Sequence, residues 1–231
     1  MTLTPVDFQQ LLIDHGYSCG PYGADGYWGK ATAGACEGWF DRGTDLLMPP
    51  TAPVGVDNIV PSAWMPDCDM TYITLHWTAG AYEASDHDKE CYHIIIESDG
   101  NLVRGDHPIS DNVSTSDDNY AAHTSQANTK NIGIACAAMA GAVESPFNAG
   151  KYPLTETQWL TSAKVAAELG LVYGIEPDRI KMLSHGEWQS TMGVPQAGKW
   201  DINRLPWSPG LDKSEVNDLW REHVTSFMKG E

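Results

Sequence analysis

Several short apolar runs after residue 69 have the length and composition of buried strands. They are "MTYITLHWT" (70–78), "NIGIACAAM" (131–139) and the apolar part of "DRIKMLSHGEW" (178–188). Apolar runs of this length, bounded by polar turns, are typical of strands in the interior of a sheet. A further segment, "KECYHIIIESDGNLVRG" (89–105), predicts a β-hairpin that turns at Ser98, Asp99 and Gly100.

A helical pattern separates the later strands. The segment "TETQWLTSAKVAAELGLVYGI" (155–175) has apolar residues at helical spacing, and Thr155 and Gln158 stand at the two positions of a capping box. Strands that alternate with helices predict an α/β domain. We therefore expect residues 70–231 to form one domain, a mixed central β-sheet flanked by helices.

Residues 1–46 predict a small helical domain in front of the α/β domain. The segment "TPVDFQQLLIDHGY" (4–17) has a threonine cap and a proline at the first helical position, and "KATAGACEGWFDRG" (30–43) predicts a second helix. Residues 47–69 are rich in proline and lack periodicity, so they predict a linker. An ordered arm packed across the second domain is the alternative for this stretch.

The charge of the chain narrows the range of partners. The formal net charge is −17, which argues against nucleic acid and against anionic membranes as partners. No stretch has the pattern of a secretory signal or the roughly 20 apolar residues of a membrane span, so we expect synthesis in the cytoplasm. The nine tryptophans are typical of surfaces that stack on sugars, with a tryptophan-rich core as the alternative.

Two histidines stand where an apolar strand runs into a polar loop. His76 ends the first strand and His185 ends the last one, and the loop that follows His185 carries Lys199 and Asp201. Two imidazoles and a carboxylate suit zinc and leave its fourth tetrahedral position for water. These residues are far apart in sequence, so their spacing alone does not distinguish a zinc site from packed core histidines.

Residues 70–210 resemble the type-2 N-acetylmuramoyl-L-alanine amidases, a family of zinc enzymes that includes phage endolysins and peptidoglycan-recognition proteins. The matching blocks, in the order of the family, are "ITLHWTAG", "CYHIIIESDGNLVRG", "AAHTSQANTKNIGIACA" and "LSHGEWQ" with the later "GKWD". The N-terminal segment resembles the small helical peptidoglycan-binding module. The residues that match that module are Gln9, Leu12, Gly16, Tyr17, Asp25, Gly26, Trp28, Gly29, Thr32, Ala35 and Phe40.

The amidase resemblance implies roles for residues at the motif positions of the family. The implied metal ligands are His76, His185 and Asp201, the catalytic residues are Tyr92 and Lys199, and the substrate-binding residues are Trp77 and His123. This chain has "DINRLPW" where the family has Asp-Pro-Gly, so the resemblance does not define the conformation of the loop at Asp201. Glu187 is expected either to orient a ligand or to stabilise the fold, and His93 to be packed or hydrogen-bonded.

The resemblance implies a zinc-dependent amidase that hydrolyses the bond between N-acetylmuramic acid and L-alanine in peptidoglycan. The expected partners are the glycan strand and the stem peptide of the cell wall, the expected cofactor is Zn²⁺, and we expect a monomer. The expected role is that of a phage or prophage endolysin that acts on the host wall. The alternatives are a non-catalytic peptidoglycan-recognition protein on the same fold and a zinc endopeptidase that cuts the stem peptide.

Overall fold

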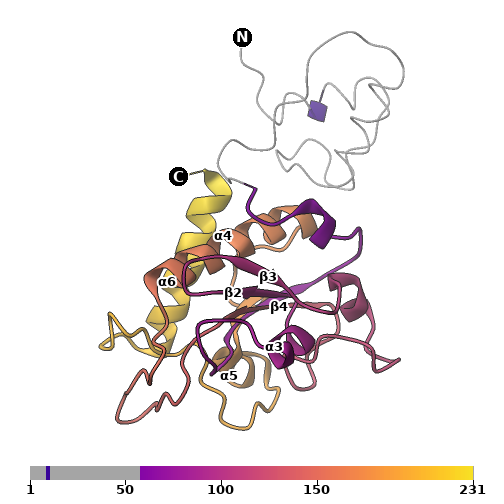
Figure 1. Ribbon diagram of the computed structural model, residues 1–231. Helices are drawn as coiled ribbons and strands as arrows, with labels where there is room; N and C mark the ends of the chain where they lie inside the picture. Colours follow the sequence, from indigo (N-terminus) through magenta and orange to yellow (C-terminus); the bar gives the residue numbers. More distant parts are fainter. Residues whose placement is uncertain (1–8, 11–57, 231) are drawn as a thin grey trace.

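The computed structural model describes residues 9–10 and 58–230 of the chain (Figure 1). Except for residues 9–10, the expected helical module lies outside the described residues, and so do residues 47–57 of the expected linker. The described part contains a five-stranded sheet of order β3-β2-β4-β1-β5. Its strands are β1 (Tyr72–Trp77), β2 (Ile94–Ile96), β3 (Leu102–Arg104), β4 (Asn131–Cys136) and β5 (Met182–Ser184).

Helices cover the sheet. The α-helices are α3 (Asp86–Cys91), α4 (Glu156–Tyr173), α5 (Trp188–Met192) and α6 (Lys213–Lys229), and the 3-10 turns are η1 (Ser62–Trp64), η2 (Ile109–Val113) and η3 (His185–Glu187). The long helices α4 and α6 pack against each other, and α4 also contacts β4 (Figure 1). The fold class expected from the sequence, a mixed sheet flanked by helices, is confirmed. Among the described residues, no helix has both the length and the apolarity to cross a bilayer.

Strand β1 lies between β4 and β5 in the sheet. It pairs in parallel with β4, where His76 is opposite Ala135, and in parallel with β5, where Leu75 is opposite Ser184. The carboxyl ends of parallel strands meet at one edge of a sheet. His76 near the end of β1 and His185 directly after β5 are therefore delivered to the same edge.

Helix α4 forms where its sequence predicts it. Thr155 Oγ1 accepts from the Gln158 backbone N–H at 3.1 Å, and Gln158 Oε1 accepts from the Thr155 N–H at 3.1 Å, which completes the capping box. The helix ends at Gly174, which has the left-handed conformation (φ 67°) that favours glycine at this position. Its buried residues include Trp159 and Ala163, and the helix packs against both the sheet and α6.

The hairpin is shorter than its sequence predicts. Strands β2 and β3 pair in antiparallel fashion across the expected turn, with Ile94 opposite Arg104. Residues 89–91, expected in the first strand, belong instead to helix α3. The reason lies upstream, because Ser85 forms a capping box with Asp88 and starts a helix that runs to Cys91.

The described end of the expected linker packs on helix α4. The backbone N–H groups of Ile59 and Val60 both donate to the Glu168 carboxylate at 3.0 Å. The Tyr173 hydroxyl donates to the Pro66 carbonyl at 3.0 Å. The chain between residues 59 and 66 is thus an ordered segment against the helix.

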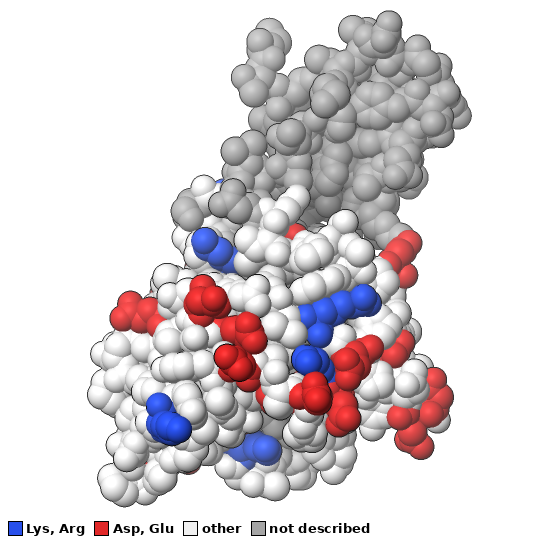
Figure 2. Space-filling model, viewed as in Figure 1, with Lys and Arg blue, Asp and Glu red and all other residues white. Residues whose placement is uncertain are grey.

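The described surface carries its charges in small groups. The whole chain has 31 acidic and 14 basic side chains. On the face drawn in Figure 2, acidic side chains gather in several clusters, and the basic ones lie beside or between them. This face therefore presents no continuous basic surface of the kind that binds polyanions.

Candidate active site

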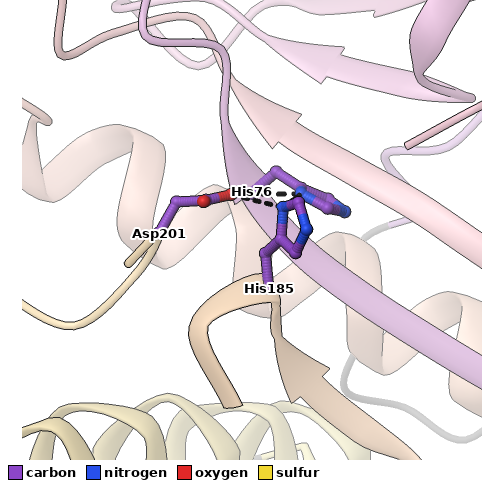
Figure 3. A group of neighbouring side chains, drawn as sticks. All are labelled: His76, His185 and Asp201. Carbon is purple, nitrogen blue, oxygen red and sulfur yellow. Dashed lines mark hydrogen bonds and ion pairs between the residues drawn. The ribbon is translucent and has the colours of Figure 1, made fainter. Parts of the chain in front are cut away.

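The side chains of His76, His185 and Asp201 converge at the carboxyl edge of the sheet (Figure 3). The Nδ1 atoms of the two histidines are 3.0 Å apart, and each lies close to Asp201 Oδ2, at 3.1 Å from His76 and 3.2 Å from His185. All three residues are buried. The loop after β5 returns to the sheet edge and brings Asp201 to the two histidines, as its matched sequence block implies.

The spacing of these three atoms fits a tetrahedral zinc site. Ligand atoms about 2.0–2.1 Å from zinc, at tetrahedral angles, are roughly 3.3 Å from one another. The three observed separations, 3.0, 3.1 and 3.2 Å, are close to that value. Two imidazole nitrogens and one carboxylate oxygen are also a donor set that zinc binds. The group therefore could hold a metal ion.

The surroundings favour the protonation states that a metal ligand needs. Burial, with a smaller contribution from His185, lowers the pKa of His76 to about 4, although the contact with Asp201 opposes this shift. Burial would raise the pKa of Asp201, but the contacts with His185 and His76 outweigh it and hold the pKa at about 2. Near neutral pH these two residues are a neutral imidazole and a carboxylate, and both forms bind divalent metal ions.

The outer nitrogens of both histidine rings have partners of their own. His76 Nε2 lies 3.2 Å from His123 Nδ1. His185 Nε2 lies 2.9 Å from Gln196 Oε1. Contacts of this kind orient the rings of metal-binding histidines. Here they leave the two Nδ1 atoms turned toward Asp201.

A cleft of about 1020 Å³ opens over the three residues. The sequence-predicted residues that line it are Trp77, Tyr92, His123, His185, Lys199 and Asp201. His76 is fully buried behind its wall. The fold therefore brings all seven predicted site residues to one place, six of them on the cleft surface and one beneath it.

Tyr92 and Lys199 present polar groups to this cleft. The Tyr92 ring centre is 5.1 Å from that of His76. Burial, together with the charge of Asp201, raises the pKa of Tyr92 above its usual range, so its hydroxyl remains a proton donor. Lys199 is exposed on the loop that leads to Asp201, and its positive charge acts on His76.

Trp77 and His123 line the cleft, but most of each side chain is buried. Trp77 is only 6 % exposed and packs edge-on against Trp200, with ring centres 4.6 Å apart. His123 is also buried, and its ring stands edge-on to His76 at 5.2 Å. Burial, together with the charges of neighbouring histidines, lowers the pKa of His123 well below its usual value. His123 thus touches a candidate ligand as well as the cleft.

Glu187 and His93 have structural partners. The Glu187 carboxylate accepts from the Arg221 guanidinium at 2.9 and 3.0 Å and from the Ser184 backbone N–H at 3.0 Å. His93 Nδ1 accepts from the Gly133 N–H at 2.9 Å, and its Nε2 lies 3.0 Å from Asn112 Oδ1. His93 is therefore packed and hydrogen-bonded, as predicted, and the contacts of Glu187 favour its role in the fold.

Sequence reasoning missed Gln196 and Thr124, which contact the candidate ligands. Gln196 contacts His185 from the loop between β5 and Asp201, and Thr124 Oγ1 lies 3.4 Å from His76 Nε2. Neither residue stands at a motif position, and neither belongs to a periodic pattern. Thr124 directly follows His123 in a matched block, and this adjacency was the one available signal.

Comparison with known proteins places residues 66–204 in a described family. A family model described as N-acetylmuramoyl-L-alanine amidase matches these residues. No curated protein matches the chain. The matched span includes every residue of the cleft and of the three-residue group described above.

Three of the solved structures that the chain matches are an amidase, an endolysin and a hydrolase. The N-acetylmuramoyl-L-alanine amidase LysC from Clostridium intestinale URNW is 18% identical, with a TM-score of 0.40, and the match covers 61% of this chain and 81% of that one. The Ph2119 endolysin from a Thermus scotoductus bacteriophage is 15% identical, with a TM-score of 0.41 and coverages of 69% and 87%. The Staphylococcus aureus hydrolase AmiA, solved with its ligand, is 12% identical, with a TM-score of 0.44 and coverages of 70% and 76%.

Proposed function

The chain belongs to the N-acetylmuramoyl-L-alanine amidase family, and from this premise we propose that His76, His185 and Asp201 hold a zinc ion with which it hydrolyses peptidoglycan. The bond cut is the amide between the lactyl group of N-acetylmuramic acid and the L-alanine of the stem peptide. Supporting this reaction is one observation above all. Three ligand atoms, 3.0–3.2 Å apart, converge at the edge of a cleft that also contains Tyr92 and Lys199.

An amide resists hydrolysis because its carbonyl is a poor electrophile and water is a poor nucleophile. A zinc ion bound at this site would polarise the carbonyl and bring the pKa of a water molecule to roughly 7. The buried carboxylate of Asp201 and the two imidazoles supply one negative charge in total, so the site stays positively charged when loaded. The protein has to orient the substrate and to stabilise the charge that develops on the carbonyl oxygen.

Lys199 and Tyr92 supply that stabilisation in our proposal. The Lys199 ammonium is exposed to the cleft and stabilises the oxyanion of the tetrahedral intermediate. The raised pKa of Tyr92 keeps its hydroxyl protonated, so it donates a hydrogen bond to the attacking water or to the intermediate. Each group acts through its charge or through a hydrogen bond, and neither forms a covalent bond with the substrate.

The substrate contacts follow from the walls of the cleft. Trp77 and Trp200 form an aromatic corner beside Asp201, and the more exposed Trp200 is suited to stack on a sugar ring or on an alanine methyl group. His123 lines the same cleft. We assign the glycan strand and the stem peptide to this surface. Residues 1–46, as a peptidoglycan-binding module, would add a second contact with the wall.

We assign the biological role of a phage or prophage endolysin that lyses the host wall. The pairing of an expected wall-binding module with an amidase domain supports this role. A non-catalytic recognition protein on the same fold is disfavoured, because Asp201 completes the set of three ligand atoms.

The test of the reaction is a digest of purified sacculi with zinc-loaded protein. An amidase lowers the turbidity and releases fragments with new L-alanine amino termini, and His185→Ala, handled in the same way, releases none. New termini at other stem-peptide residues would identify an endopeptidase. Binding to sacculi without any new termini would identify a recognition protein.

A further inference from the structure

The protons on the rings of His76 and His185 decide whether either ring can bind a metal through Nδ1. A neutral imidazole carries one N–H, and the other nitrogen has the lone pair that a metal needs. The hydrogen bond at one nitrogen fixes which form is present. The hydrogen-bond partners of the two Nε2 atoms therefore indicate which ring nitrogen carries the proton.

The series of contacts that fixes the His76 tautomer starts at a backbone carbonyl. The carbonyl oxygen of Asn131 lies 3.1 Å from His123 Nε2 and is able only to accept a hydrogen bond. His123 Nε2 therefore carries the ring proton. In the neutral ring, His123 Nδ1 then has the lone pair.

Three atoms meet at the other side of the His123 ring. His123 Nδ1 is 3.2 Å from His76 Nε2 and 2.9 Å from Thr124 Oγ1, and the last two atoms are 3.4 Å apart. A proton on His76 Nε2, together with the Thr124 hydroxyl, satisfies every acceptor in this triangle. The other tautomer of His76 would put its proton on Nδ1, which faces Asp201 Oδ2 at 3.1 Å, but it would place two lone pairs opposite each other at 3.2 Å behind the ring.

Gln196 fixes the tautomer of His185 in a similar way. The Gln196 side-chain NH₂ donates to the Ser125 carbonyl at 2.9 Å, which turns its oxygen toward the histidine. That oxygen lies 2.9 Å from His185 Nε2 and accepts its proton. The lone pair of His185 is then on Nδ1.

Both sets of contacts leave the lone pair of the histidine ring on Nδ1. Two Nδ1 lone pairs and one carboxylate oxygen face one another at 3.0–3.2 Å, with the ring protons held on the far sides. Three acceptors so close together repel one another unless a cation lies between them.

We propose that His123 and Gln196 are positioning residues that set the ring tautomers of His76 and His185 and so prepare both Nδ1 atoms for the metal. The inference rests on the proposed function, because it concerns the same zinc site. It adds that His123 acts through His76, in addition to any contact with substrate. It also assigns a role to Gln196, which no motif of the sequence identifies.

Gly133 on β4 provides the space for the His123 ring. A Cβ atom at this position would lie 2.6–2.9 Å from three atoms of that ring, closer than real contacts allow. Gly133→Ala therefore displaces His123 without removing its nitrogen atoms. This substitution tests the position of the ring separately from its chemistry.

The test uses the full-length chain and two measurements. The first is the ¹⁵N chemical shifts of the histidine rings in metal-free protein, well above the usual histidine pKa of about 6.5. The second is zinc affinity, measured by competition with a chromogenic chelator. We expect protonated Nε2 and unprotonated Nδ1 in His76 and His185 of the wild type.

The variants come in matched pairs. His123→Phe and Gln196→Met remove the acceptor, and both are expected to lower zinc affinity about 10–100-fold, the usual effect of losing such a partner. His123→Asn and Gln196→Glu keep an acceptor oxygen and are expected to retain most of the affinity. His93→Gln alters a buried histidine whose ring lies edge-on to His123, with ring centres 5.7 Å apart, but does not contact the ligands, so it controls for disturbed packing around His123.

The outcomes separate this inference from the proposed function. Tight zinc binding by His123→Phe and Gln196→Met, or a proton on Nδ1 of the wild-type rings, overturns the inference and leaves the zinc site standing. Failure of the wild type to bind zinc overturns the proposed metal site, and the ring shifts alone then decide the tautomers. If His123→Phe does not fold, Gly133→Ala and the Gln196 pair carry the test.

Discussion

The Arg221 guanidinium on α6 binds the Glu187 carboxylate through two nitrogens, at 2.9 and 3.0 Å. Glu187 lies two residues after His185, and Arg221 also donates to the Met182 carbonyl at the start of β5 at 3.0 Å. Both side chains of the pair are buried. Helix α6 is thus tied to the strand and turn that position one of the proposed zinc ligands.

Removal of Arg221 should destabilise the domain strongly. Arg221→Met leaves the Glu187 carboxylate buried without its partner, and such a loss typically costs roughly 3–5 kcal/mol of unfolding free energy. Urea titration measures the change. Arg179→Met is the control, because the Arg179 side chain is largely exposed and its pair with Asp218 should contribute less than about 1 kcal/mol. Equal effects of the two substitutions would contradict this account.

Asp201→Asn should abolish tight zinc binding. The substitution keeps the size of the side chain but removes the negative charge between the two imidazoles. The loss should exceed the roughly 100-fold effect of an outer hydrogen-bond partner, and chelator competition measures it. Asp212→Asn serves as the control, because Asp212 caps α6 and asparagine caps equally well. Unchanged affinity in Asp201→Asn would remove this residue from the ligand set.

Lys199→Ala should lower kcat and leave zinc binding intact. Loss of one donor to a developing oxyanion typically costs about 100–1000-fold in kcat. Steady-state rates on a soluble muropeptide, together with a metal assay, check both parts. Lys229→Ala, in the last turn of α6, is the control and should behave as the wild type. An effect confined to KM would reassign Lys199 to substrate binding.

Metal removal should reduce both activity and thermal stability. Dialysis against a chelator should abolish hydrolysis, and added zinc should restore it. A ligand present at 100 times its Kd stabilises the folded state by about 2.7 kcal/mol, so zinc should also raise Tm. Calorimetry of the metal-free and reloaded protein measures this shift. Full activity in protein shown to be metal-free would exclude the proposed mechanism.

Acid should destabilise the domain in part through His93. Burial lowers its pKa from 6.5 to about 4, and the Gly133 N–H occupies its Nδ1. Between these two values the unfolded chain binds more protons, so the unfolding free energy falls as pH falls from about 6.5 to about 4. The contribution of His93 is roughly 3 kcal/mol.

Urea titrations of wild type and His93→Gln over this pH range test the sign. The wild type should be the more stable protein at pH 7 and should lose its advantage as the pH is lowered toward 4. An advantage that stays constant over the whole range would show that His93 does not titrate in this way.

Residues with local signals could be placed from the sequence. The capping pattern of Thr155 and Gln158 predicted α4, and the apolar runs that end at His76 and His185 predicted both strand ends. Because parallel strands finish at one edge, the two histidines could be expected to meet there. The loop after His185 offered Asp201 as a candidate carboxylate, and the family motif selected it as the third ligand.

Contacts that depend on tertiary structure gave no signal. Gln196 reaches His185 only because the loop after β5 folds back over the cleft, and its spacing from the histidine has no periodic meaning. The acceptor for His123 is a main-chain carbonyl, and every residue type has one. The predicted strand at residues 89–91 was wrong for a local reason, because Ser85 and Asp88 cap a helix that continues to Cys91.

The contact between His123 and the Asn131 carbonyl has a consequence for sequence drift. A substitution at position 131 changes the side chain but leaves the carbonyl oxygen, so no point mutation there can delete this acceptor. Gly133 is different, because any larger residue intrudes on the His123 ring. Mutation can therefore displace the His123 ring through position 133 but cannot remove the acceptor that position 131 supplies, and a library that randomises position 133 should enrich glycine.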